Sequence, residues 1–375
     1  MTASVIEQKA TRSYGIDLLK LFSMLMIVLL HVLGIGGVLA GLQPGTAAHD
    51  LGWWLESACY GAVNCFALTT GFLMAEGRYK PHRLLTLWLQ VVFYTIGITV
   101  FFRLFYPDVV TMLNWKAAPR PVMARQYWYF TAYFAMYLFI PFFNKLIAVL
   151  TKGEFRRLLG SILLLMVLAF WAKDDIFRLQ NGYTMAWLSM LYFFGAYFKK
   201  YPPEKVRPML WIGIYLLATG CTWACKLATV YLDGQAGGPA AWGGMMLSYT
   251  SPTVFLASLM LFLLFLHLQV RPRWLQKLAA WLSPAAFSVY IIHCHPLVWH
   301  NVLTGRFASF ASYGLPGMPA AVFLAAGSIW LACLLADRVR ILLFGFVGID
   351  RISQKLVDGL VRLGGRLMRE NHGQN

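Results

Sequence analysis

The chain has 375 residues, of which 59% are hydrophobic and only 13% are charged, and its mean hydropathy is +0.61. A soluble globule cannot cover its surface with so few charged side chains, so the composition excludes that class and indicates an integral membrane protein. The formal net charge of +17 would suit a nucleic-acid-binding protein, but basic loops that meet anionic lipid headgroups account for it more simply, and no nucleic-acid partner is expected.

The apolar segments are long and continuous. Runs of around 20 apolar residues match a hydrocarbon core roughly 30 Å thick, and they do not alternate every second residue as barrel strands do. Inside lipid each segment has to satisfy its own backbone hydrogen bonds, which favours helices. The sequence therefore predicts an all-α, polytopic membrane protein with about ten transmembrane helices, near residues 16–39, 52–76, 84–106, 127–150, 158–172, 183–199, 207–231, 249–270, 284–303 and 318–348.

Basic residues are distributed unequally between the two sets of connections. With the N-terminus in the cytoplasm, the cytoplasmic connections and termini hold 23 Lys and Arg residues and the opposite connections hold 6. Because Lys and Arg are enriched in cytoplasmic loops, both termini are predicted to be cytoplasmic. Residues 1–348 are expected to form one membrane domain, and residues 349–375 a basic amphipathic helix on the inner membrane surface.

The first span carries Asp17, Lys20 and His31. Lys20 and His31 are eleven residues apart, close to three helical turns, so they share a face about 16 Å apart. A titratable imidazole at this depth is costly unless it faces a protein interior, which makes His31 the first catalytic candidate; a ring that only bonds a backbone carbonyl is the alternative. Lys20 is a candidate for binding an anionic ligand, although a lysine that only reaches the headgroups fits equally well.

Glu56 lies four or five residues into the second span from the outside. This depth places it level with His31, whose ring it would orient or charge-balance, and it is the second catalytic candidate. A carboxylate that reaches the nearby interface is the equal alternative.

The connection at 77–83 contains Arg78, Lys80 and Arg83 at the cytoplasmic start of the third span. Arg binds phosphate through two parallel hydrogen bonds and Lys as a point charge, so this cluster is a candidate binding site for a phosphorylated cofactor. Ordinary enrichment of basic residues in cytoplasmic loops explains the cluster at least as well.

Aromatic residues Tyr127, Trp128 and Tyr129 stand at the outer end of the fourth span. They first indicate an interfacial aromatic belt, and second a mouth on which sugar rings stack.

The ninth span contains Tyr290, His293, His295 and His300. His293 and His300 share a face, but there is no neighbouring carboxylate pair and no usual zinc spacing, so no metal is expected. Six cysteines all lie in the predicted spans and indicate no disulfide framework.

Several motifs, in the same order over residues 12 to 345, resemble those of a known protein family. The pattern Asp17-x-x-Lys20-x(10)-His31 closely resembles the start of the type 3 membrane acyltransferase family, and the branch that O-acetylates enterobacterial common antigen most of all. The supporting motifs are Thr70-Gly71-Phe72-Leu73, a basic helix start at Arg83, Tyr127-Trp128-Tyr129-Phe130 and Phe287-Ser-Val-Tyr290-Ile-Ile-His293.

The resemblance implies a multi-pass enzyme of the bacterial cytoplasmic membrane that transfers acetyl from cytoplasmic acetyl-CoA to a hydroxyl of an extracytoplasmic or lipid-linked glycan. It gives His31 the position of the family's essential histidine and Lys20 that of a basic residue that is usually Arg. Arg83 takes the place of the first Arg of an Arg-x-x-Arg motif, whose second Arg is here Thr86. No motif bears on oligomeric state.

Two roles for His31 are consistent with this chemistry. A neutral imidazole acts as a general base on the acceptor hydroxyl, or it accepts the acetyl group itself as a nucleophile. The alternative from another class is a transporter or flippase for a polar solute or lipid-linked sugar, against which stands the absence of an evident inverted repeat. A glycan polymerase is a third and weaker option, because the large outside loop expected for it is missing.

Overall fold

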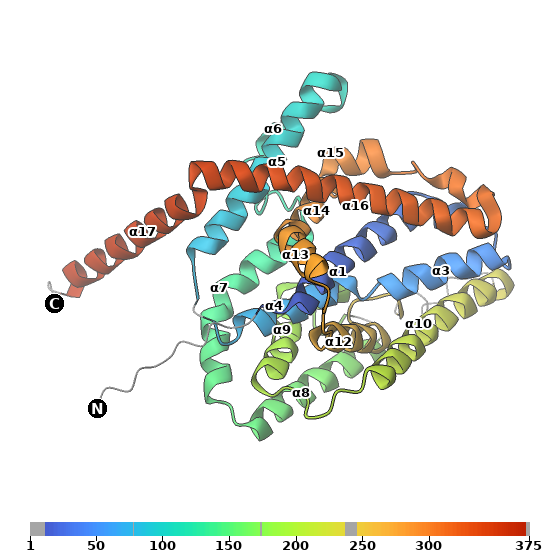
Figure 1. The fold of residues 1–375 in the computed structure, drawn as a ribbon, viewed down its shortest axis with the longest axis horizontal. Helices are drawn as coiled ribbons and strands as arrows, with labels where there is room; N and C mark the ends of the chain where they lie inside the picture. Colours follow the sequence, from blue (N-terminus) through green and yellow to red (C-terminus); the bar gives the residue numbers. More distant parts are fainter. Residues whose placement is uncertain (1–11, 78, 173–174, 237–245, 373–375) are drawn as a thin grey trace.

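The computed structural model describes residues 12–77, 79–172, 175–236 and 246–372 (Figure 1). Within these ranges the chain is helical and contains no strand, as the sequence predicts. Seven helical segments are long and apolar enough to cross a membrane: Tyr14–Gly41, Ala47–Met74, His82–Phe105, Trp128–Val149, Pro208–Val230, Arg273–His293 and Ala308–Val347.

Three of the ten predicted spans correspond to helices outside this set. α9 (Met185–Lys200) and α12 (Pro252–Leu266) have 16 and 15 residues, fewer than the roughly 20 that a straight crossing needs. α8 (Lys152–Trp171) begins in a charged turn. The helical class is therefore confirmed, while the count of ten and the orientation of the termini stay predictions.

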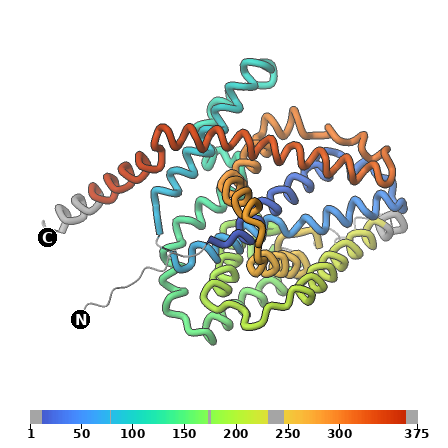
Figure 2. Tube along the Cα trace, in the orientation of Figure 1, coloured from blue at the N-terminus to red at the C-terminus, as the bar shows by residue number. Residues whose placement is uncertain are grey.

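Helix α1 (Tyr14–Leu33) lies at the centre of the bundle (Figure 2). Its first turn is capped by the side chain of Ser13, which accepts a hydrogen bond from the amide of Ile16. Because neighbours cover it on most sides, the side chains of this helix are buried in protein rather than in lipid. The surrounding helices are α3 (Ala47–Cys59), α4 (Ala62–Met74), α12, α13 (Arg273–Leu282), α14 (Ala286–His293) and α16 (Gly314–Val347).

Outer layers complete the bundle. The peripheral elements are α2 (Val38–Gly41), α5 (His82–Phe105), α6 (Met112–Ala117), α7 (Trp128–Val149), α8, α9, α10 (Pro208–Ala236), α15 (Pro296–Val298) and α17 (Ile349–His372). α6 and α17 project from the body in Figure 1. α17 packs against α5, where the carboxylate of Asp350 accepts a hydrogen bond from Thr86 over 3.2 Å.

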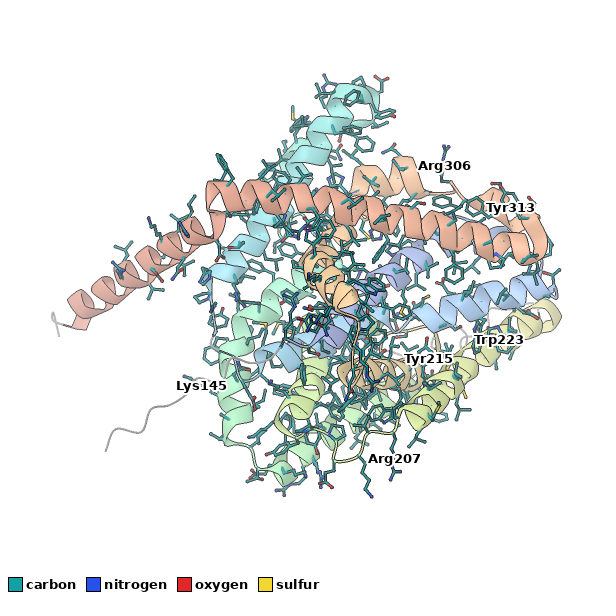
Figure 3. The ribbon with its side chains drawn as sticks, in the orientation of Figure 1. Lys145, Arg207, Tyr215, Trp223, Arg306 and Tyr313 are labelled. Atoms are coloured by element: carbon teal, nitrogen blue, oxygen red, sulfur yellow. The ribbon has the colours of Figure 1, made fainter. Side chains whose placement is uncertain are left out.

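Connections that the charge pattern assigns to one side of the membrane do lie together. In Figure 3, Lys145 and Arg207 lie on the lower side of the molecule, away from Arg306 and Tyr313 at the upper right. A cavity of about 530 Å³ is lined by residues from three predicted cytoplasmic connections or the helix ends beside them, among them Tyr79, Lys145 and Lys200. The fold is thus compatible with the predicted sidedness.

The predicted ninth span, 284–303, differs most from the structure. The segment that is long and apolar enough to cross is Arg273–His293, and the helix ends at His293. Pro296 starts a new short helix, and Trp299–Leu303 forms a π-helix. A proline cannot donate the amide hydrogen bond that would continue α14, so the segment predicted as the outer half of a straight helix becomes an irregular outer rim.

A buried polar network holds α14 in place. Asp337 of α16 is fully buried and receives two hydrogen bonds from Arg340, over 2.9 and 2.7 Å. It also accepts from Ser288 of α14, and that hydroxyl in turn accepts from Gln90 of α5 over 2.6 Å. A charge in hydrocarbon is tolerated when it is paired and fully hydrogen-bonded, and here the pairing fixes α14 between α5 and α16.

Helices α4 and α9 approach so closely that only glycine fits between them. A Cβ atom added at Gly71 would lie 2.0 Å from the carbonyl oxygen of Tyr192, and one at Gly195 would lie 1.9 Å from that of Leu68. Small residues at such contacts let backbones of membrane helices meet. This explains the glycine in the sequence Thr70-Gly71-Phe72.

We expect Gly71→Ala or Gly195→Ala to force α4 and α9 apart and lower stability by about 1–3 kcal/mol, the usual cost of overpacking. Thermal unfolding in detergent, followed by size-exclusion profile, measures the loss. Gly97→Ala is the matched control, because nothing lies within 4 Å of a Cβ there. Equal melting temperatures for all three variants would contradict the close contact.

Candidate active site

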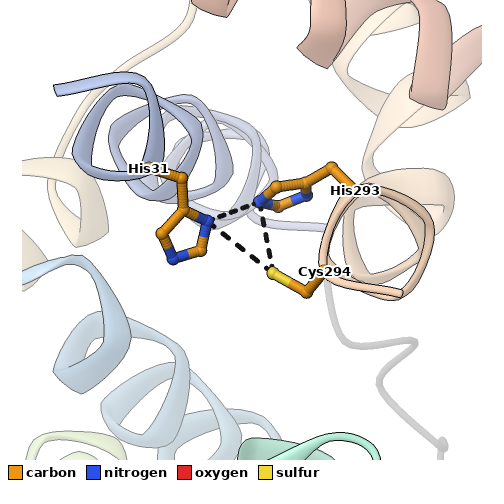
Figure 4. A group of neighbouring side chains, drawn as sticks. All are labelled: His31, His293 and Cys294. Atoms are coloured by element: carbon orange, nitrogen blue, oxygen red, sulfur yellow. Dashed lines mark hydrogen bonds between the residues drawn. The ribbon is translucent and has the colours of Figure 1, made fainter. Parts of the chain in front are cut away.

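Two histidines from opposite ends of the sequence meet inside the bundle. Nδ1 of His31, near the end of α1, lies 2.8 Å from Nε2 of His293, the last residue of α14 (Figure 4). His293 is buried, with 1% of its surface exposed, and His31 is partly accessible. The ring of Trp299 packs edge-on against His31 at 4.8 Å between centroids.

The hydrogen bonds define which nitrogen carries the proton. Nδ1 of His293 is at hydrogen-bond distance from the carbonyl oxygen of Val289, which can only accept, so this nitrogen donates. In a neutral ring Nε2 is then the acceptor, and the hydrogen bond to it has to be donated by Nδ1 of His31. The Nε2 atom of His31 is left with a free lone pair, which is the arrangement that a general base needs.

Cys294 joins this pair, and sequence reasoning missed it. Its Sγ lies 3.4 Å from Nε2 of His293 and 3.7 Å from Nδ1 of His31. The three side chains form the group drawn in Figure 4. The only available signal was the position of Cys294 next to His293, and nothing in the sequence links either residue to His31.

His31, His293 and Cys294 are also a possible set of metal ligands, because each offers one ligand atom and these atoms lie within 4.8 Å of one another. Two nitrogen ligands of a tetrahedral zinc ion lie about 3.3 Å apart, because each bond is about 2.0 Å long. The 2.8 Å between the two imidazoles is instead a hydrogen-bond length. The geometry favours a hydrogen-bonded pair, and the absence of a metal stays a prediction.

His31 borders two cavities. One is interior and small, about 30 Å³, and is lined by Met24, Ile27, Phe66 and Tyr129 among others. The other, about 240 Å³, is more open and is lined by Gln126, Cys294, Trp299 and His300 as well as His31. Trp128 and Tyr290 line both cavities. One imidazole therefore faces both the inside of the bundle and its predicted outer mouth.

The aromatic motif of the fourth span is buried in the site. Tyr127 and Tyr129 have 1% and 7% of their surface exposed, so they do not form an interfacial belt. The Tyr127 hydroxyl donates to the carbonyl of Ile291 over 3.0 Å, and the hydroxyl of Tyr290 accepts from the amide of Tyr129 over 3.3 Å. These bonds attach the start of α7 to α14 beside the histidine pair.

A row of tyrosines runs from the interior cavity toward the predicted cytoplasmic side. Tyr129, Tyr133 and Tyr137 repeat every four residues on one face of α7, and neighbouring ring centroids are 6.1 Å apart. Tyr137 donates to the carbonyl of Lys80 and contacts the ring of Tyr79, which lines the 530 Å³ cavity. We call Tyr129, Tyr133, Tyr137 and Tyr79 the tyrosine row.

Two of the predicted cationic residues, Lys80 and Arg83, lie at the end of this row that is farther from His31. Lys80 and Arg83 are exposed, and the Arg83 guanidinium interacts electrostatically with the hydroxyls of Tyr133 and Tyr137. Arg78 lies outside the described residues. Lys20 has its Nζ 3.6 Å from Asp17, which also bonds Arg12 at 2.6 Å and accepts from Ser283.

Glu56 is not brought to His31 by any hydrogen bond among the described residues. One carboxylate oxygen of Glu56 is buried with no hydrogen-bond partner there. The ring of His31 is held by His293, which takes the orienting contact that Glu56 was expected to make. A catalytic role for Glu56 stays a prediction.

A comparison with protein families gives one match. A model described as an acyltransferase domain, the type 3 class, covers residues 13–337, which include the histidine pair, Cys294 and the tyrosine row. Comparison with curated proteins and with solved structures gives no significant match.

The hydrogen-bond chain predicts one tautomer for His31. In protein labelled with ¹⁵N at histidine, Nδ1 of His31 should carry the proton, and His293→Leu should increase the Nε2-protonated form several-fold, because a hydrogen bond of about 1 kcal/mol is lost. Histidine ¹⁵N chemical shifts measure the proportions of the two tautomers. The His31→Gln variant identifies which signals belong to His31. A wild-type ring protonated on Nε2 would contradict the chain of bonds.

Proposed function

The chain belongs to the type 3 acyltransferase family, and from that premise we propose that it transfers an acetyl group from cytoplasmic acetyl-CoA to a hydroxyl of an extracytoplasmic or lipid-linked glycan. The observation that carries this proposal is the position of His31 between an interior cavity and an open one. A donor from one side and an acceptor from the other would both reach the same imidazole.

The donor route follows the tyrosine row. The phosphates of acetyl-CoA would stay at Lys80 and Arg83, where Arg offers paired hydrogen bonds and Lys a point charge. The pantetheine arm, which carries two amides, would lie along Tyr137 and Tyr133, whose hydroxyls and ring faces suit a partly polar chain. Tyr129 and Tyr137 are eight residues apart, about 12 Å along the helix.

Helices α1 and α4, which lie opposite the tyrosine row, support the same route for the donor arm. Lys20, Met24, Ile27 and His31 are spaced by four, three and four residues and therefore share one face of α1. On the otherwise buried inner half of α4, Phe66 and Thr70 are partly accessible. The interior cavity of about 30 Å³ holds one water-sized molecule, so the donor arm enters only when side chains along the row move aside.

At the site, the free Nε2 of His31 takes the proton of the acceptor hydroxyl while its oxygen attacks the acetyl carbonyl. His293 accepts the hydrogen bond of Nδ1 and stabilises the imidazolium that forms. Trp128 and Tyr290, which line the open cavity, are the surfaces on which a sugar ring would stack. The transporter alternative has no comparable support, because the family match covers the whole site.

The tail has its own proposed role. Ile352, Leu356 and Leu360 of α17 are exposed, and basic Arg351 and Lys355 lie among them. We propose that this helix lies on the inner leaflet, with its apolar side in the headgroup region and its basic side toward anionic lipids.

His31→Ala should lower the rate of thioester cleavage and acetyl transfer by about 100-fold to 10,000-fold, the usual range for loss of a general base. Thioester cleavage and acetyl transfer are both measured with purified protein, radiolabelled acetyl-CoA and a membrane extract as the source of acceptor. His267→Ala is the control, because His267 bonds only its own helix at Leu263 and packs on Trp211. Full activity of His31→Ala, with an unchanged melting temperature, would refute the role of His31.

Lys80→Met and Arg83→Met should each raise KM for acetyl-CoA roughly tenfold with little change in kcat, because one phosphate contact is worth about 1.4 kcal/mol. Lys20→Met is expected to act in the same direction. Acetyl-pantetheine, which lacks the nucleotide phosphates, should show no such change, and Lys116→Met in a predicted outer loop is the control. Equal effects on both donors would place these cations outside the phosphate site.

A further inference from the structure

Cys294 lies beside the histidine pair, in a position that suits a nucleophile. Its sulfur is within 4 Å of both imidazoles of the site, and it lines the open cavity together with His31 and His300. Among the described cysteines, Cys59, Cys65 and Cys333 are buried, and Cys221 and Cys225 lie on α10. Cys294 combines access to a cavity with contact to a base.

The base for this thiol is His293. Because Nδ1 of His293 donates to Val289, its Nε2 is an acceptor, and the sulfur and Nδ1 of His31 are two alternative donors to this one lone pair. A separation of 3.4 Å suits a hydrogen bond from S–H to nitrogen. A thiol paired with an imidazole whose orientation is fixed by a third group is the arrangement that activates cysteine nucleophiles.

We propose that Cys294 carries the acetyl group between donor and acceptor, as an S-acetyl intermediate; this inference rests on the proposed acetyltransferase function. In the first step the S–H group replaces Nδ1–H of His31 as the donor to Nε2 of His293, the thiol proton passes to that nitrogen, and the sulfur attacks the thioester carbonyl carbon. The bond from that carbon to the CoA sulfur breaks, and the leaving sulfur takes the proton from His293. One thioester replaces another, so the step is close to isoenergetic.

The second step uses the other histidine. Nε2 of His31 takes the proton of the acceptor hydroxyl, whose oxygen attacks the acetyl carbon on Cys294. The carbon–sulfur bond breaks, an ester forms, and the imidazolium of His31 passes its Nδ1 proton to the sulfur 3.7 Å away, which restores the thiol and leaves the other proton on Nε2. Donor and acceptor then never have to occupy the site together, and the acetyl group waits on Cys294 in the open cavity.

The test traps the intermediate. Purified full-length protein is mixed with acetyl-CoA without acceptor, digested and mapped by mass spectrometry. We expect one acetyl group on the peptide that contains Cys294, released by neutral hydroxylamine and by addition of acceptor. Cys294→Ala should abolish the adduct and lower acetyl transfer by at least about 100-fold. Cys225→Ala is the matched control, because Cys225 is a partly exposed thiol on α10. This variant should keep both the acetyl adduct on Cys294 and the rate of acetyl transfer.

Three outcomes would overturn the proposal. The first is Cys294→Ala with the transfer rate of wild type. The second is the acetyl group on His31 instead of Cys294. The third is stoichiometric zinc in the wild-type protein that is lost with Cys294→Ala, because the sulfur would then be a metal ligand. Cys294→Ser and thermal unfolding separate loss of the nucleophile from misfolding, since serine preserves the size and hydrogen bonding of the site.

Failure of this inference is distinguishable from failure of the proposed function. Active Cys294→Ala alongside inactive His31→Ala leaves the acetyltransferase intact and rejects only the covalent route. Absence of thioester cleavage by wild-type protein with any acceptor rejects both.

Discussion

The hydrogen bond between the imidazoles of His31 and His293 joins α1 to α14 in the interior of the membrane domain, and the geometry of the site depends on it. A polar ring buried without a partner costs several kcal/mol in such surroundings. Three of the four ring nitrogens in the pair are therefore constrained: His293 bonds its own helix through Val289, and His31 bonds His293. Among the described residues, Nε2 of His31 has no hydrogen-bond partner, and the sulfur of Cys294 is held only by its contacts with the two rings; these are the two groups to which we assign chemistry.

That hydrogen bond requires α14 to end where it does. Pro296 cannot continue the helix, so α14 ends at His293, Cys294 caps it, and the chain turns there. At the other end of α14, Ser288 is bonded to the buried Asp337 and Arg340 pair. A helix of eight residues has little stability of its own, so the network and the histidine pair together position it.

The parts of this arrangement that depend on local sequence could be predicted, and those that depend on contacts between distant segments could not. Composition indicated a helical membrane protein, and the depth of His31 in an apolar run singled it out. His31 and His293 are 262 residues apart, and no pattern in the sequence predicts that they pair. Tyr127 and Tyr129 were first read as an interfacial belt because aromatic residues near the end of a span usually form one; bonds to α14 draw them inward instead. The break after His293 was missed because the apolar run continues through Pro296.

An enzyme that takes its donor from one side of a membrane and its acceptor from the other must connect the two without an open pore. The interior cavity at His31 is about 30 Å³ and the outer one about 240 Å³, so the inner approach is the narrower of the two. Aromatic and Met side chains fill the inner approach, and they exclude water that would otherwise hydrolyse an activated acyl group. In the proposed reaction the donor arm would have to take the place of those side chains, and binding of its phosphates at Lys80 and Arg83 would offset their displacement. Under the proposed function, the basic residues at the tyrosine row and the narrow inner cavity would therefore act together: phosphate binding at the first would open the second.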